Sequence, residues 1–404
     1  MNSLQASPEL SRKTRVGVWF GGQSPEHEVS VISALQAASA LDGDRFVPVP
    51  VYVSKQGQWY AGNHLLELER YQDLASLVAD ATEVALAPGT GQTARLVPVH
   101  GPLLGRAEPV VLDVVFVAFH GGSGENGGVQ GMCEMLGVPY TGSGVLSSAA
   151  GMDKVVAKTL CQLDGVPVVP WQVVAENEWR GHEDTFLKMI QDALGMPLIV
   201  KPVRLGSSIG IAKVTTAEEL EAAMEDAFRY DSRALIEQCV PNLREINASV
   251  LGRGATCRVS VLEEPVAADA FLSFKDKYQR SAGKSSGMAS LDRLIPAPLE
   301  AHVAERIRGL AVQAFTALDS AGVARIDFLM DAGTGDVYFN EINTIPGSFS
   351  FYLWEPAGLP FRELLSELID LAFERFEEQQ ARVQSYDINL LQERAVRGLK
   401  GAKS

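Results

Sequence analysis

The segment from residue 323 to residue 347, VARIDFLMDAGTGDVYFNEINTIPG, places the tightest limits on what this chain can fold into. Ala324–Met330 alternates as a half-buried strand does, and Val337–Asn343 reads as a second strand that returns beside it. The residues between them are rich in Gly, Asp and Thr, which favour turns. The segment therefore predicts two strands joined by a turn.

Polar side chains on these two strands carry the strongest functional signal in the sequence. Because side chains alternate across a strand, Arg325 and Asp327 share one face of the first strand. Glu341 and Asn343 likewise share one face of the second. Where the two faces coincide, two carboxylates and an amide oxygen converge beside a guanidinium, and such hard oxygen ligands suit Mg²⁺. The alternative is a polar hairpin on the surface. We favour the metal site because R-x-D is followed by N-E-x-N-T-x-P-G.

The composition limits the class of protein. A length of 404 residues is enough for two or three domains, and 46% hydrophobic with 21% charged residues is ordinary for a globular protein. The net charge of −15 argues against a nucleic-acid partner. The four cysteines form no C-x-x-C pair, so we expect neither a zinc site nor disulfides. No apolar run suits a signal peptide or a membrane span, so we expect a cytoplasmic protein without a membrane contact.

The start of the chain predicts a parallel α/β sheet. A short apolar strand, Val16–Phe20, runs into the turn GGQS, and a helix follows from about Glu26 to Ala40. Functional groups in such sheets collect at the carboxyl ends of the strands, where Glu26 lies. A carboxylate at a helix start is also an ordinary structural choice. From position alone, a cap and a functional acid are equally good interpretations of Glu26.

A glycine-rich loop follows the predicted buried strand Val111–Phe119, which ends in His120. Gly122, Gly124 and Gly127 satisfy G-x-G-x-x-G between a strand and a helix, the fingerprint of dinucleotide binding. The acidic residue expected about twenty positions further on is missing. Such a loop also lets an anionic substrate approach backbone N–H groups. We favour this second interpretation.

Lys201 ends a predicted strand, Pro197–Pro202, and the loop 203–210 that follows is rich in Gly and Ser. A further strand, and no helix, comes next, so the loop predicts a flexible flap and not a Walker loop. A lysine at a buried strand end needs an anionic partner. A nucleotide phosphate fits this role, and a structural salt bridge is the alternative.

A long loop with little periodicity, Phe271–Pro298, predicts either a lid or a disordered segment. Lys277 and Tyr278, with two glycines nearby, favour a lid that brings a positive charge to a phosphate. Helices are expected at Ala301–Ala321 and Pro360–Gln380, and the polar tail 381–404 has no assigned role.

Taken together, these motifs resemble the ATP-grasp superfamily and, within it, the D-alanine–D-alanine ligases, over about residues 15–380. The motifs in family order are GGQSPEHEVS at 21–30, HGGSGENGGVQG at 120–131, MDK at 152–154, VKPVRLGSSIG at 200–210, the predicted lid, and RID to NEINTIPG at 325–347.

The resemblance implies an α/β (α+β) fold, a three-domain ATP-grasp fold with ATP between the second and third domains. The expected divisions are a Rossmann-like, parallel α/β domain at 1–148, a central ATP-grasp subdomain at 149–237, and a C-terminal subdomain at 238–380 with a lid at 272–296. A homodimer is implied by the resemblance alone.

The resemblance also assigns ATP and metal contacts, residue by residue. The residues assigned to ATP are Lys154, Lys201 and Lys277 (phosphates), Glu237 (hinge acid), Val240 (backbone to adenine), Glu245 (ribose), and Ser207, Ser208, Phe271 and Asn340. Two Mg²⁺ ions, with Mn²⁺ as the alternative ion, are assigned to Asp327, Glu341 and Asn343.

The implied reaction is Mg-ATP-dependent joining of two D-alanines through an acyl phosphate, for peptidoglycan precursor synthesis. The residues assigned to substrates and chemistry are Glu26 (ammonium of the first D-alanine), Ser207 and Tyr278 (linked to Glu26), Arg325 and Gly347 (tetrahedral intermediate), Lys277 (lid charge), and His120, Tyr352 and Leu353 (substrate contacts).

Two departures from the family pattern concern the substrate pockets. Leu272 stands where many relatives carry a tyrosine, and Tyr352 stands where they carry a serine. We expect Tyr352 and Trp354 to narrow the second pocket, which suits D-alanine. The alternatives are a ligase that uses D-lactate or another D-amino acid second, a nicotinamide oxidoreductase, and a non-catalytic nucleotide-binding regulator.

Overall fold

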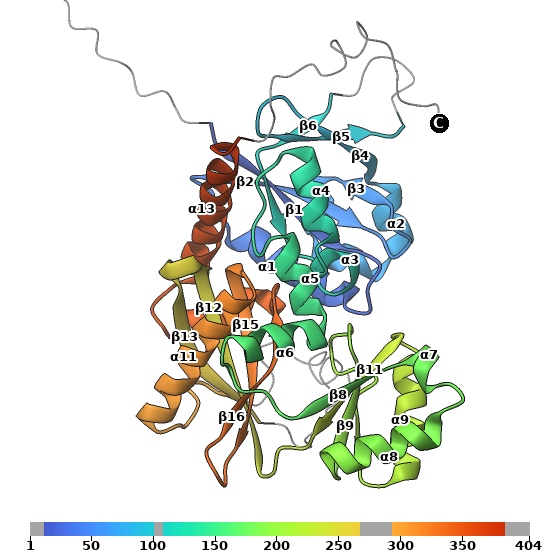
Figure 1. Ribbon diagram of the computed structural model, residues 1–404. Coiled ribbons are helices and arrows are strands. Elements are labelled where there is room, and N and C mark those ends of the chain that lie inside the picture. The colour runs from blue at the N-terminus through green and yellow to red at the C-terminus, as the bar shows by residue number, and fades with distance from the viewer. Residues whose placement is uncertain (1–11, 101–107, 267–292, 384–404) are drawn as a thin grey trace, which may run out of the picture.

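The computed structural model describes residues 12–100, 108–266 and 293–383. They form three β-sheets with helices packed on them (Figure 1). The seven-stranded sheet lies at the top of the view, the five-stranded sheet at lower left and the four-stranded sheet at lower right. Four residues named above lie outside the described residues, as do most of the predicted lid and the tail from residue 384. These four are Phe271, Leu272, Lys277 and Tyr278.

The seven-stranded sheet has the order β6-β5-β4-β3-β2-β1-β7. The strands β2, β1 and β7 run parallel, as the opening strand–turn–helix pattern predicts. Antiparallel pairing joins β2 through to β6, so the whole sheet is mixed and not parallel throughout. Its strands are β1 (Thr14–Gly21), β2 (Phe46–Val53), β3 (Trp59–Ala61), β4 (Thr82–Pro88), β5 (Ala94–Pro98), β6 (Val110–Leu112) and β7 (Val114–Val117).

Asp113 divides the single strand predicted at Val111–Phe119, and that prediction is wrong. The side chain of Arg12 and the backbone N–H of Arg15 donate to the Asp113 carboxylate. Before Asp113 the chain pairs with β5, and after it with β1. The strand therefore changes its partner at the acid.

Two loops connect parallel strands of this sheet to the helices that pack on it. Residues 22–26 connect β1 to α1, and residues 118–121 connect β7 to α3, so both loops lie at the carboxyl ends of parallel strands, where ligands bind in such sheets. The helices of this part are α1 (His27–Ala40), η1 (Asn63–Leu66), η2 (Leu68–Gln72), α2 (Leu74–Ala79), α3 (Gly122–Glu125), α4 (Gly128–Leu136) and α5 (Val145–Met152).

The four-stranded sheet has the order β10-β9-β11-β8, with antiparallel neighbours throughout. One face packs Val200 and Ile236 into a core with Trp179 and Met224. The opposite face carries Lys201, because side chains alternate across a strand. The elements are β8 (Trp171–Ala175), β9 (Leu198–Pro202), β10 (Ala212–Val214), β11 (Arg233–Gln238), α7 (Glu176–Trp179), α8 (Glu183–Leu194) and α9 (Ala217–Phe228).

The five-stranded sheet has the order β14-β13-β12-β15-β16, and its central strands are antiparallel. Ala324, Ile326 and Phe328 bury one face of β15 against α6 and α11, and the alternate residues face the other way. The elements are α6 (Lys154–Leu163), β12 (Leu243–Arg253), η3 (Gly254–Thr256), β13 (Arg258–Pro265), β14 (Arg293–Leu294), α11 (Ala301–Ala317), β15 (Ala321–Asp331) and β16 (Val337–Asn343).

The end of the chain returns to the first sheet. Leu364, Leu368 and Ile369 of α13 (Phe361–Gln380) share a core with β1 and β7, and Figure 1 shows α13 alongside that sheet. Two short elements, η6 (Gly347–Ser350) and α12 (Phe351–Trp354), connect β16 to α13. The helix predicted to reach Ala321 ends at Ala317, because Ala321 already belongs to β15. Within the described ranges, no helix has the length and apolar character needed to cross a membrane.

Candidate active site

A cavity of about 740 Å³ is lined by residues from both smaller sheets and from the loops at the edge of the seven-stranded sheet. The predicted site residues that line it are Glu26, His120, Lys154, Lys201, Ser207, Ser208, Glu237, Val240, Glu245, Arg325, Asp327, Asn340, Glu341, Asn343, Gly347 and Tyr352. Of the predicted site residues that the structure describes, Leu353 alone is not in the lining.

Four polar residues form a row across the five-stranded sheet. Glu263 on β13 pairs with Asn247 on β12, Asn247 pairs with Asp327 on β15, and Asp327 pairs with Glu341 on β16. All four line the cavity. The faces of β15 and β16 therefore coincide, which is the condition on which the predicted metal site depended.

Asp327 lies at the centre of this row. The Nε and Nη2 groups of Arg325 donate to its two oxygens, each at 2.7 Å, and Asn343 Nδ2 donates to its Oδ2 at 3.0 Å. Burial raises the pKa of Asp327, against the opposing effect of the Arg325 charge. The carboxylate is thus held by fixed donors, in a place where burial makes its negative charge costly.

Glu341 faces the lysines on the other side of the row. Lys154 Nζ lies 3.0 Å from Glu341 Oε2. Burial raises the pKa of Glu341, but the charges of Lys154 and Lys201 bring it down to about 2. Glu341 is therefore ionised at neutral pH.

The residues present fit a divalent cation. Asp327, Glu341 and Asn343 supply two carboxylates and an amide from adjoining strands, and Mg²⁺ completes such a set with water and phosphate oxygens. In the described part of the chain no group of three or more His, Cys, Asp or Glu side chains is placed to hold a metal ion without further ligands. A site that shares its ion with a bound phosphate needs no such group.

The lysines predicted to meet phosphates lie on the other wall. Asp153 caps α6 by accepting the backbone N–H groups of Val155 and Val156, which fixes Lys154 at the first position of the helix. Lys201 Nζ donates to Asn340 Oδ1 at 3.0 Å and forms an ion pair with Glu237. Both lysines are nearly buried, so their charges act in a place with little water.

Lys158 is a buried lysine that the sequence motifs did not single out. Its Nζ lies 2.7 Å from Glu237 Oε1 and donates to the backbone oxygen of Phe339 at 3.1 Å. Burial raises the pKa of Glu237, and the charges of Lys158 and Lys201 outweigh it and lower this pKa to about 2. Glu237 is thus a fixed anion between two lysines. The salt bridge weighed as the alternative for Lys201 is present, in the same cavity as the phosphate candidates.

Glu26 enters the cavity from the start of α1. Ser207 Oγ, from the flap after β9, donates to Glu26 Oε1. Burial raises the pKa of Glu26, and the Ser207 hydrogen bond opposes this. A Cβ at Gly121, whose φ is +66°, would lie 2.7 Å from Glu26 Oε2, so only glycine fits there. The glycine loop therefore makes room for an acid.

Glu125 is a second buried acid beside Glu26 that the sequence interpretation missed. It accepts the backbone N–H of Gly121 at 2.9 Å and that of Ile345 at 3.3 Å, so it links the glycine loop to the loop after β16. Burial, with the nearby Glu26 charge, raises the pKa of Glu125 to about 7. Burial also lowers the pKa of His120 to about 4, and His120 Nε2 contacts Ser33 Oγ at 2.9 Å.

The segment after Gly347 takes an unusual path. Ser348, Phe349 and Ser350 have φ angles of 51°, 54° and 52°, in the left-handed region that L-residues rarely occupy. This turn leaves Tyr352 in the cavity lining, while Leu353 and Trp354 are buried in the core. Trp354 Nε1 donates to Ser249 Oγ at 2.9 Å. The expectation that Trp354 narrows the second pocket is therefore wrong.

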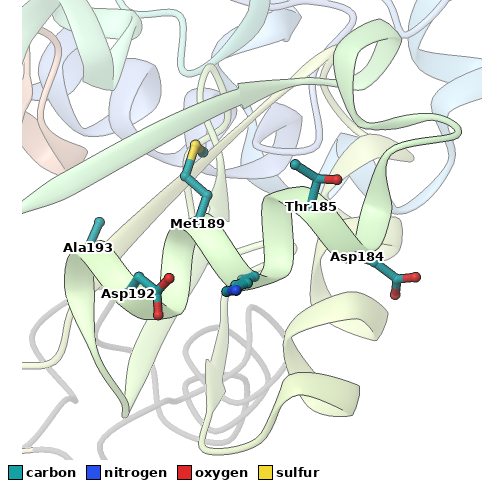
Figure 2. A pocket seen from close by; sticks show the side chains of 6 residues that line it. Asp184, Thr185, Met189, Asp192 and Ala193 are labelled. Carbon is teal, nitrogen blue, oxygen red and sulfur yellow. The ribbon is translucent and has the colours of Figure 1, made fainter.

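A second hollow lies on the outer face of α8, where Figure 2 shows Asp184, Thr185, Met189, Asp192 and Ala193 along one helix. It shares no residue with the cavity described above. Its polar groups form no described link to the row of acids. We therefore assign it no part in the chemistry.

Comparison with known proteins identifies the family to which this geometry belongs. Residues 15–143 match the model of the D-ala D-ala ligase N-terminus, and residues 160–370 match that of the D-ala D-ala ligase C-terminus. The chain belongs to the D-alanine–D-alanine ligase family. The family interpretation made from the sequence motifs is thus confirmed, as is the three-domain ATP-grasp fold class.

Individual relatives match over nearly their whole length. The D-alanine–D-alanine ligase A of Bradyrhizobium diazoefficiens is 42% identical over 93% of this chain and 100% of its own. A solved D-alanine–D-alanine ligase from Coxiella burnetii has 30% identity and a TM-score of 0.76, over 95% of this chain and 99% of its own. The VanG D-Ala:D-Ser ligase of Enterococcus faecalis has 30% identity and a TM-score of 0.74, over 89% and 100%.

Membership of the D-alanine–D-alanine ligase family decides between the open interpretations. The enzyme is an ATP-dependent ligase that forms a carbon–nitrogen bond and needs a divalent metal. The nicotinamide oxidoreductase hypothesis is wrong. A Cβ at Gly124 would lie 2.2 Å from the Phe119 Cβ, so this glycine of the G-x-G-x-x-G pattern serves close packing against the segment that follows β7. The family match does not favour a non-catalytic regulator.

Proposed function

We propose that this protein joins two D-alanines into D-alanyl-D-alanine, with ATP as the energy source and through an acyl phosphate. The observation that carries the proposal is the cross-strand row from Asn247 to Glu341, which faces Lys154 and Lys201 across one cavity. Such a site gathers the oxygen ligands and positive charges that phosphoryl transfer requires.

In the first step, a carboxylate oxygen of D-alanine attacks the γ-phosphorus of ATP and ADP leaves. Lys154 and Lys201 offset negative charge on the phosphoryl group in flight, and they act strongly because they are nearly buried. Asp327, Glu341 and Asn343 would hold two Mg²⁺ ions, or Mn²⁺ in their place. A bound divalent cation supplies charge neutralisation and orients the phosphate oxygens.

In the second step, the amine of another D-alanine attacks the acyl phosphate and inorganic phosphate leaves. The developing oxyanion would be stabilised by Arg325 and the Gly347 N–H, both at the cavity wall. Glu26, oriented by Ser207, would hold the ammonium group of the first D-alanine. The raised pKa of Glu26 reflects a site that gains from a positively charged ligand.

We further propose that Tyr352 restricts the second pocket to a small side chain, so that D-alanine is preferred over bulky D-amino acids. Tyr278, which lies outside the described residues in the predicted lid, would be linked through Ser207 to Glu26 and would favour an amine over the hydroxyl of D-lactate. Incubation with equal D-alanine and D-lactate tests this. Mostly ester product would refute the role of Tyr278, and preference for a large D-amino acid would refute the role of Tyr352.

The domain boundaries near residues 148 and 237, cytoplasmic location and a homodimer are also proposals. In support of the boundaries, the seven-stranded sheet ends with β7, the four-stranded sheet spans residues 171–238, and the five-stranded sheet begins at Leu243. A monomer in analytical ultracentrifugation would contradict the proposed homodimer.

The experiment that tests the proposed activity is phosphate release from Mg-ATP by the purified protein, with D-alanine, with L-alanine and with no amino acid. Of the three conditions, we expect phosphate release only with D-alanine, and one molecule of D-alanyl-D-alanine formed for each phosphate released. ATP binding without D-alanine-stimulated turnover would refute the proposal.

A further inference from the structure

Four side chains in the wall of the cavity contact one another, and two of them, Glu263 and Tyr352, interact electrostatically with Arg325. They come from four different elements: Asn247 from β12, Glu263 from β13, Arg293 from β14 and Tyr352 from α12. We call them the end-wall cluster. The proposed function gives no role to Glu263 or Arg293.

Contacts within the end-wall cluster converge on Glu263. Arg293 Nη1 lies 3.1 Å from Glu263 Oε1, while Asn247 Nδ2 and the Tyr352 hydroxyl donate to Glu263 Oε2 at 3.2 Å and 3.4 Å. The Arg293 guanidinium also lies 4.5 Å from the centre of the Tyr352 ring. Arg293 is therefore held both by an ion pair and by an aromatic face.

Burying the charges of Arg293 and Glu263 costs free energy of folding, so we look for a functional reason for this ion pair. The side chain of Arg293 is 9% exposed and that of Glu263 is 3% exposed. Buried ion pairs rarely stabilise a fold more than apolar residues of the same size would. A buried guanidinium in a cavity wall is the residue of choice for binding a carboxylate.

The charges around Arg325 leave one positive charge unmatched during the reaction. Arg293 and Arg325 carry two positive charges, and Glu263 and Asp327 carry two negative ones. When Asp327 serves a metal ion, as the proposed function requires, Glu263 alone faces the two guanidinium groups. The second amino acid brings one carboxylate that does not react, and this carboxylate restores the balance.

We propose that Arg293 binds the carboxylate of the second amino acid together with Arg325, and that Glu263 is a positioning residue that holds Arg293 over the Tyr352 ring. This inference rests on the proposed function, because it concerns the acceptor in the second step. The acceptor class that follows is a small α-amino acid whose carboxylate is free.

The test compares two acceptors that differ in one group. D-Alanine carries the carboxylate, and D-alaninamide carries a neutral amide in its place. In Arg293→Met we expect the KM for D-alanine at the second site to rise roughly 10- to 100-fold, the effect of losing one charged hydrogen-bonding partner. The KM values for ATP and for the first D-alanine should stay within about twofold. Use of D-alaninamide as acceptor should change little.

Two further variants separate positioning from charge. Arg293→Lys keeps the charge without the planar fork, so its increase in the second KM should be smaller. Glu263→Gln should raise the second KM as well, because the guanidinium loses its anchor. Arg244→Met is the matched control, since Arg244 pairs with the neighbouring Glu264 and does not line the cavity. It should leave both KM values unchanged.

If Arg293→Met loses activity equally with D-alanine and D-alaninamide as acceptor, Arg293 is structural only. The same follows if the KM for D-alanine at the second site does not rise. If Arg293→Met fails to fold, Arg293→Lys tests the proposal in its place. The proposal requires that this variant lose more activity with D-alanine as acceptor than with D-alaninamide. Failure of the proposed function looks different. In that case the unmodified protein itself would release no phosphate in response to D-alanine.

Discussion

Asp327 and Glu341 are cross-strand partners on β15 and β16, and a β-bulge begins directly after Asp327. Their pairing places two carboxylates side by side on the cavity face of the sheet. The extra residue of this bulge is Asn340 on β16, because Asp327 pairs with Glu341 and Phe328 with Phe339. Phe339 therefore lies in the core, while Asn340 and Glu341 both line the cavity. The pair of Asp327 and Glu341 separates the guanidinium side of the site from the lysine side.

The first prediction concerns Glu341→Gln, which keeps the shape of the side chain and removes a charged metal ligand. We expect turnover to fall by about three orders of magnitude, because charge stabilisation of the phosphoryl group depends on the ion that Glu341 helps to hold. Circular dichroism should still show a folded protein. Near-normal turnover at saturating Mg-ATP would remove Glu341 from the metal site.

The second prediction concerns the pH dependence of stability through Glu125. Its pKa rises from an ordinary 4.5 to about 7 in the folded protein, so the folded state binds the proton more tightly than the unfolded state. The stabilisation is complete below about pH 4.5 and is lost as the pH rises through 7, a change of about 3 kcal/mol.

Glu125→Gln removes this titration. The variant should be destabilised more at pH 5 than at pH 8, as measured by urea unfolding at both values. Glu26 and Glu341, whose charges also act on Glu125, are present in both proteins and do not account for the difference. A destabilisation that is the same at both pH values would contradict the raised pKa.

The third prediction concerns the left-handed turn after Gly347. Ser350 has a φ of 52°, and within the described chain its buried Oγ has no hydrogen-bond partner. Ser350→Gly relieves both costs and should raise the free energy of unfolding by roughly 1 kcal/mol. The control Ser366→Gly, in the middle of α13, should lower it by roughly 0.5 kcal/mol. A loss of stability in Ser350→Gly would show that the turn is not strained.

The fourth prediction concerns Lys158→Met, which replaces a fully buried, charged side chain with an uncharged one of similar length. Glu237 would keep Lys201 as its only lysine partner among the described residues, so we expect a loss of about 3 kcal/mol in stability. The KM for ATP should rise, because Glu237 and Lys201 shift together. Lys188→Met, on the exposed face of α8, is the control and should change neither quantity. An unchanged KM for ATP would limit Lys158 to a structural role.

The sequence reveals the site where a local period determines the geometry. Arg325 and Asp327 are two residues apart, as are Glu341 and Asn343, so strand alternation alone predicts their shared face. Lys154 is likewise predictable, because Asp153 is a strong helix cap. The direction of each of these side chains is set by the residues within a few positions of it in the sequence.

Other residues depend on long-range structure that no local pattern carries. Glu263 joins the polar row only because β13 pairs with β12 in one register. Glu125 lies inside a glycine pattern that draws attention to the backbone, and its partner Ile345 is 220 positions away in the chain. Tyr352 and Trp354 lie two positions apart on α12, so they point to opposite sides of the helix, and the left-handed turn that sets the direction of α12 contains no glycine that could have predicted it. The tertiary structure alone shows these relationships.

The most direct measurement follows oxygen from D-alanine to phosphate. D-Alanine labelled with ¹⁸O in its carboxylate is incubated with the protein and Mg-ATP, and the dipeptide and phosphate are analysed by mass spectrometry. Formation of an acyl phosphate predicts one D-alanyl-D-alanine and one ¹⁸O atom in inorganic phosphate per turnover. Dipeptide accompanied by unlabelled phosphate would contradict the acyl phosphate, and phosphate without dipeptide would contradict the ligase.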